Sequence, residues 1–162
     1  MNKKGTSIKL HNLNNVKIRS PAFKDKEPLQ KKYTCDGENI NPPLFFEDVP
    51  ENAKSLVLIV DDPDAVGGRT FKHWSVFNID PTVKELPENS IPRGGIEAMT
   101  DFGKPGYGGP CPPSGTHRYF FKLYALDDKL NIPETVKKED IEEAMKNHIL
   151  ESSELIGLYK RS

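Results

Sequence analysis

The sequence lacks an apolar run long enough to cross a membrane. The longest uninterrupted apolar run covers residues 56–60, whereas a transmembrane helix needs roughly 20 apolar residues. The polar residues 1–7 also lack the apolar segment of a secretory signal peptide. We therefore expect a cytoplasmic protein with no stable membrane association.

An excess of charge of one sign is also missing. Lys and Arg number 23 against 24 for Asp and Glu, and the two signs are mixed along the chain. Nucleic-acid binding needs a basic patch that this composition does not supply, so we expect no nucleic-acid partner. Any anion bound here must be bound by a local group of residues.

Cysteine is scarce. Cys35 and Cys111 are the two cysteines of the chain, which is too few for the disulfide framework of a small secreted protein, and they do not form a CxxC pair. We expect both to be free or, at most, paired only with each other.

Turn-forming residues and short apolar segments favour strands over long helices. The chain has 14 prolines and 12 glycines, and between them short segments rich in β-branched and aromatic residues predict strands. A length of 162 residues suits a single domain over residues 1–162. The expected strands cover residues 55–60, 73–79, 118–126 and 155–159, with weaker candidates at 8–10, 16–18 and 44–46, and the first of them should end at Asp61-Asp62-Pro63.

One segment near the C-terminus has a helical pattern. Its apolar positions recur at i, i+3, i+4, i+7 and i+8, and two acidic residues, Glu139 and Asp140, suit the first turn. We expect a helix of three to four turns that packs on the sheet through Ile141, Ala144, Met145, His148 and Ile149. The long segment 80–116 shows little periodicity and is expected to be an ordered but irregular loop.

Polar side chains gather where three of the predicted strands begin or end. Asp62 and Asp64 follow the apolar strand, His73 begins the next, and His117 and Tyr119 share one face of a third because strand residues alternate. Two imidazoles and a phenol can hold a phosphate or a carboxylate while an aspartate orients a ring. Spacing alone also fits plain structural roles, a packed histidine or an Asp-Pro turn.

The same segments resemble the signature of a known family. DPDA at 62–65, HW at 73–74 and GYGGPCPPSGTHRY at 106–119 resemble the signature segments of the phosphatidylethanolamine-binding protein family, and YTCDG at 33–37 resembles its prokaryotic branch, often called Raf kinase inhibitor-like proteins. The chain departs from the family at Val66, Phe71 and Asp80, of which none is an expected ligand group.

The resemblance implies a mainly β fold: a β-sandwich-like arrangement of two sheets with a C-terminal helix and short peripheral helical turns. It also implies a pocket for phosphate or a phosphoryl head group, and a binding protein rather than an enzyme, without cofactor or metal. The partner is then a small phosphorylated or carboxylated ligand, and the family allows a kinase or protease partner and a homodimer. The residues implied at the pocket are Asp62, Asp64, His73, Gly109, Pro110, Cys111, His117 and Tyr119.

Two alternatives stay open at this stage. Cys111, His117 and Asp62 could serve as thiol, base and orienting group of a hydrolase. Cys35 and Cys111 could join His73 and His117 in a zinc site, although the paired-ligand spacing of such sites is missing. We assign the remaining histidines, His11 and His148, to solvent or packing.

Overall fold

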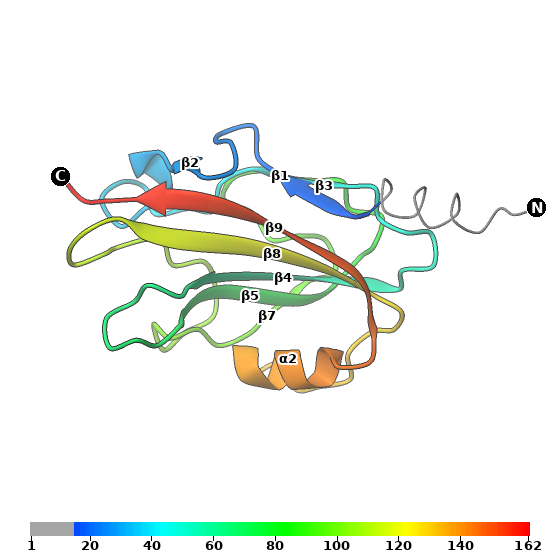
Figure 1. Cartoon of the computed structure of the whole chain (residues 1–162). Helices are drawn as coiled ribbons and strands as arrows, with labels where there is room; N and C mark the ends of the chain where they lie inside the picture. Colours follow the sequence, from blue (N-terminus) through cyan, green and yellow to red (C-terminus); the bar gives the residue numbers. More distant parts are fainter. Residues whose placement is uncertain (1–14) are drawn as a thin grey trace, which may run out of the picture.

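The computed structural model describes residues 15–162, in which two β-sheets pack face to face and a helix covers the outer side of the larger sheet. In Figure 1 the small sheet and α2 lie on opposite sides of the six-stranded sheet. The mainly β, two-sheet prediction is therefore confirmed. The large sheet has the order β2-β9-β8-β4-β5-β7 and the small one β1-β3-β6. The strands of the large sheet are β2 Glu27–Pro28, β4 Ser55–Asp62, β5 Phe71–Ile79, β7 Ile96–Glu97, β8 His117–Leu126 and β9 Ile149–Tyr159.

The central strand of the large sheet is β4, and all eight of its residues are buried. Its apolar, β-branched sequence suits a strand that is covered on both faces. The strand does not end before Asp61, as the sequence suggested, because pairing continues through Asp61↔Phe120 and Asp62↔Phe71. Asp62 and His117 are thus strand residues, which fixes their backbones by ladder hydrogen bonds.

The small sheet closes the main core from the other side. It consists of β1 Lys17–Arg19, β3 Leu44–Glu47 and β6 Glu85–Leu86. The large apolar residues between the two sheets include Phe46, Trp74 and Phe121. Two short strands, β6 and β7, lie within residues 80–116, so the expectation of a wholly irregular loop there was wrong. A 3-10 turn, η1 Lys31–Tyr33, supplies a peripheral helical turn.

The helix is shorter than the apolar pattern suggested. α2 covers Lys138–Met145, and its buried apolar residues Ile141 and Met145 pack against the outer face of the sheet. Lys146 has left the helical conformation, with a ψ of 135°, and Asn147 has a φ of 69°, which ends the helix. His148 and Ile149 therefore lie outside it, and Ile149 begins β9, where it is 45% exposed.

Other sequence predictions can be placed directly. Residues 16–18, 44–46, 73–79, 118–126 and 155–159 all overlap observed strands. The weak strand at 8–10 and His11 lie outside the described residues. Within residues 15–162, no helix is long and apolar enough to cross a membrane.

Candidate functional site

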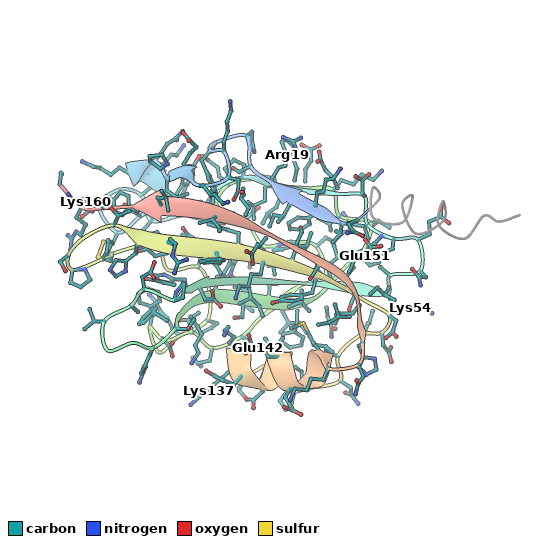
Figure 2. All side chains as sticks on the ribbon, viewed as in Figure 1. Arg19, Lys54, Lys137, Glu142, Glu151 and Lys160 are labelled. Atoms are coloured by element: carbon teal, nitrogen blue, oxygen red, sulfur yellow. A yellow bond between two sulfur atoms is a disulfide. The ribbon has the colours of Figure 1, made fainter. Side chains whose placement is uncertain are left out.

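Three strand ends meet at one end of the large sheet. Because β4 runs antiparallel to both β5 and β8, the end of β4 lies beside the beginnings of the other two strands. This is the end at which the C-terminus emerges in Figure 1, and Figure 2 shows Lys160 there, far from Lys54 and Glu151. The topology thus gathers Asp62, His73, His117 and Tyr119 from separate segments.

These four residues line one cavity of about 320 Å³. All four are buried side chains, so the polar groups form its floor rather than its rim. The other lining residues are almost all apolar: Ala65, Val66, Phe71, Phe102, Cys111, Pro112 and Pro113. A concave, mostly apolar site with a few converging polar groups is typical of a small-molecule pocket.

His73 reaches this cavity through an irregularity in β5. Val60 pairs with Trp74 whereas Asp61 pairs with Lys72, so His73 is an extra residue in its strand. Such a bulge re-aims side chains relative to strict alternation. Lys72 accordingly faces α2, where it pairs with Glu139, while the ring of His73 lies edge-on to Tyr119 at 5.3 Å.

The ring of His117 is held by Asp62. Nδ1 of His117 lies 2.7 Å from Oδ2 of Asp62, and the other oxygen of Asp62 accepts the backbone N–H of Asp64 at 2.7 Å. Both side chains are buried. Since one nitrogen of the ring is engaged with the carboxylate, Nε2 is the atom left for a ligand.

The ring of His73 is held in the same manner by backbone. Its Nδ1 lies 2.7 Å from the carbonyl oxygen of Gly108. Burial lowers the pKa of His73, an effect that the Gly108 hydrogen bond and the charge of Asp62 partly offset. The rings of Phe71 and Phe102, each within 5.3 Å of the imidazole, provide much of that apolar cover.

Tyr119 completes the floor. Its side chain is buried, and burial, followed by the charge of Asp62, raises the pKa of its hydroxyl. The phenol therefore keeps its proton and can donate it in a hydrogen bond. Within residues 15–162 no group hydrogen-bonds the Tyr119 hydroxyl or the Nε2 atoms of His73 and His117. Three hydrogen-bonding atoms are thus left for a ligand.

Asp64, which the resemblance implies beside the pocket, is engaged by Arg118. Its carboxylate accepts three hydrogen bonds from Arg118, one from the backbone and two from the guanidinium, each at 2.9 Å. These bonds hold the pKa of Asp64 below its usual range. The residue does not line the cavity. It fixes the turn after β4 against the start of β8.

Gly109 and Pro110 also lie behind the cavity wall rather than in it. The N–H of Gly109 donates to Oδ1 of Asn39 at 2.8 Å, and the carbonyl of Pro110 accepts from the N–H of Cys35 at 3.0 Å. A Cβ on Gly109 would lie 2.5 Å from that Asn39 oxygen, so the close approach requires glycine. Within the stretch 109–113, which the resemblance implies along the rim of the pocket, Cys111, Pro112 and Pro113 line the cavity.

Cys111 forms a disulfide with Cys35, which is the second of the two states expected from the sequence. The bond leaves neither sulfur available as a thiolate nucleophile or a zinc ligand, so the hydrolase and zinc alternatives lose the groups they depend on. In the part of the chain that the structure describes, no three His, Cys, Asp or Glu residues are grouped to hold a metal ion.

Sequence reasoning missed most of the apolar wall. Val66, at 74%, and Phe102, at 42%, are among the most exposed large apolar side chains described. Phe102 lies in an aperiodic loop, and nothing in its neighbourhood marks it as a wall residue. For Phe71 a signal existed, because it stands two positions before His73. In the sequence it stands out only as a departure from the family.

A second, wider hollow lies elsewhere. It measures about 1060 Å³ and runs beside β3 and β6, and its lining contains charged residues of both signs. Its Arg19 and Glu47 already pair with each other at 2.8 Å. We therefore place the candidate site in the smaller cavity, where unpartnered polar atoms converge.

Comparison with known proteins identifies the family. Residues 19–160 match the model of the family described as phosphatidylethanolamine-binding protein. The chain belongs to this family. It is 49% identical over 151 residues to a UPF0098 protein of the archaeon Methanothermobacter thermautotrophicus, an alignment that covers 90% of this chain and 99% of that protein.

Two solved structures of phosphatidylethanolamine-binding family proteins have the same fold. A homolog from Chlamydia trachomatis has a TM-score of 0.88 at 43% identity, over 92% of this chain and 99% of the other. Escherichia coli YbcL, described as a new member of the mammalian family, has a TM-score of 0.85 at 31% identity, over 91% and 99%. Relatives from archaea and bacteria agree with the prokaryotic branch indicated by the motifs.

Proposed function

We propose that the cavity binds a small anion, a phosphate, phosphoryl or carboxylate group, and that the protein is a binding module rather than an enzyme. The observation that carries this proposal is the convergence of His73 Nε2, His117 Nε2 and the Tyr119 hydroxyl, all without partners among the described residues, on one buried floor. Among the described residues, the fully buried side-chain atoms without a partner are Asp61 Oδ1, Ser75 Oγ and Ser153 Oγ, so the three floor atoms are instead open to the cavity. A ligand with several oxygens would supply their partners.

The size of the cavity limits the ligand. A volume of about 320 Å³ is at the small end of the range for ligand pockets. The apolar wall suits an uncharged substituent that leads outward from the anionic group. Membership of the phosphatidylethanolamine-binding family supports a phosphoryl head group as one such ligand.

Calorimetry with inorganic phosphate and with phosphoethanolamine tests the proposal. His117→Ala should weaken binding by about 1.5 to 3 kcal/mol, the usual range for a hydrogen bond to a charged group. Tyr119→Phe removes only the hydroxyl and should weaken binding by a similar amount while the fold is kept. His148→Ala is the matched control, because that ring pairs with Asp127 away from the cavity.

The opposite outcome is well defined. If the His117 and Tyr119 variants bind phosphate as the wild type does, the anion is bound elsewhere. If no anion binds but methylammonium does, the floor is a cation site, and its affinity should then fall as the pH falls.

We further propose that the protein regulates a kinase or a protease and that it is cytoplasmic. Family membership supports control of a kinase or protease, for which co-purification with a partner of either class is the test. We keep the cytoplasmic location as a proposal. Fractionation of intact cells would test it, with the protein expected in the cytoplasmic fraction.

A further inference from the structure

The partners of the two imidazoles fix where their protons lie. The carbonyl oxygen of Gly108 can only accept, so the Nδ1 of His73 must carry a hydrogen. The carboxylate of Asp62 likewise accepts from the Nδ1 of His117. A neutral imidazole has a single N–H. When both imidazoles are neutral, both Nε2 atoms therefore face the cavity as acceptors. An anion without a hydrogen atom would then meet two lone pairs.

The third group of the floor has the opposite polarity. Burial raises the pKa of Tyr119, so its hydroxyl remains a donor. The floor thus offers one donor and two acceptors. Satisfying all three takes an acceptor oxygen and two hydrogens, so an oxyanion with one O–H satisfies Tyr119 and one Nε2, whereas an oxyanion without hydrogen satisfies Tyr119 alone.

We infer that the pocket selects tetrahedral oxyanions that carry their own acidic proton, namely hydrogen phosphate and phosphomonoesters, ahead of sulfate and phosphodiesters. The inference rests on the proposed function and names its ligand class. A phosphomonoester can take up a proton with a pKa of about 6 and present it to an Nε2. Sulfate and a phosphodiester have no comparable proton near neutral pH.

The other way to accommodate an anion is to protonate a ring. This route requires an imidazolium, which an imidazole of ordinary pKa near 6.5 forms only to a small extent at pH 8. For His73 the surrounding phenyl rings oppose the charge further, and burial lowers its pKa. Asp61, Asp62 and Asp101 act on His73, Asp64 interacts with His117, and the ring of Tyr119 lies against both imidazoles. The carboxylates of Asp62, Asp61 and Asp101 act against the effect of burial on the pKa of His73, so proton uptake by this ring should become accessible as the pH falls.

Inorganic phosphate and sulfate make a matched pair of probes. At pH 8 both are doubly charged and tetrahedral, but only hydrogen phosphate has an O–H. We expect the full chain to bind phosphate at least tenfold more tightly than sulfate at pH 8. Sulfate should take up about one more proton than phosphate, so the preference should shrink by up to tenfold for each pH unit toward pH 6. Calorimetry in two buffers of different ionisation enthalpy measures both quantities.

Asp62→Asn reverses the polarity of one acceptor. The amide oxygen can still accept the N–H of Asp64, while the amide nitrogen would take the place of Oδ2 and donate to Nδ1 of His117. The ring would then carry its hydrogen on Nε2 and donate into the cavity. We expect the ratio of phosphate to sulfate affinity to fall severalfold at pH 8. The loss of charge at position 62 cancels in this ratio because the two probes have equal charge.

Three results are distinguishable. Equal affinity for both anions at pH 8, with no extra proton uptake by sulfate, would overturn the inference and leave anion binding intact. No binding of either anion would overturn the proposed function as well. Nitrogen NMR of the ligand-free wild type gives an independent check that does not need the variant to fold: the inference requires Nδ1–H on both His73 and His117, and an Nε2–H on either contradicts it.

Discussion

At the scale of single residues, His73 couples the site to the stability of the fold. The ring is almost fully buried, and this burial lowers its pKa, although the Gly108 carbonyl and Asp62 act against the shift. In the unfolded chain the same ring has an ordinary pKa near 6.5. Between these two values the unfolded state binds more protons, so the free energy of unfolding should fall as the pH drops below about 6.5.

His73→Asn tests this coupling. The amide can replace Nδ1–H as donor to Gly108 but does not titrate. The wild type, in phosphate-free buffer, should lose up to about 1.4 kcal/mol of stability per pH unit from this ring below pH 6.5. Urea denaturation at pH 8, 6.5 and 5 should show that slope to be absent from the variant. Parallel slopes in the two proteins would mean that His73 titrates normally in the folded state.

At the scale of elements, the sequence identified the strands better than the helix. The continuous, β-branched apolar run of β4 and the aromatic residues on both faces of β8 favour strands, and both strands were found. The helical stripe was extended too far, because His148 and Ile149 continue the i+3, i+4 spacing by chance. Backbone conformation decides the boundary, since Asn147 adopts a left-handed φ and Ile149 then pairs with Leu126.

This boundary has a measurable consequence. Ile141 and Met145 are the buried apolar residues of α2, so changing either to alanine should cost about 2 to 5 kcal/mol of stability through lost contacts and a cavity. Ile149→Ala should cost less than about 1 kcal/mol, because the side chain is half-exposed at the start of β9. Urea denaturation with unchanged m values is the measurement. An Ile149 variant as unstable as the Ile141 variant would show that α2 continues through position 149.

For the site, too, the sequence identified some features and left others to the structure. Family motifs led to Asp62, His73, His117 and Tyr119, which do meet in one cavity. Asp64, Gly109 and Pro110 belong to the same motifs but do not line that cavity, since a motif identifies a segment without saying which side chain faces inward. The tautomers of the histidines were also beyond sequence reasoning, because they depend on which acceptor lies opposite each Nδ1.

At the scale of the whole molecule, separate connections hold the wall of the cavity against the body of the protein. The Cys35–Cys111 disulfide joins segments 76 positions apart. Next to it, Asp36 accepts from the hydroxyl of Tyr159 at 2.6 Å and pairs with Arg161 at 2.9 Å, which ties the chain end to the same segment. The four groups on the floor take their positions from β4, β5 and β8 instead. Stability and binding should therefore respond differently to loss of the disulfide.

Replacing both Cys35 and Cys111 by serine separates the effect of the disulfide on stability from its effect on phosphate binding. Closing a loop of this length removes denatured-state entropy worth about 4 kcal/mol in the chain-entropy model, and measured values usually lie near 2 to 4. The double variant should lose about that much stability in urea. Its phosphate affinity at 25 °C should stay within about threefold of wild type, because the hydrogen bonds of Gly109 to Asn39 and of Cys35 to Pro110 use backbone atoms that remain. Loss of phosphate binding in a variant that is still folded would show instead that the disulfide positions the floor.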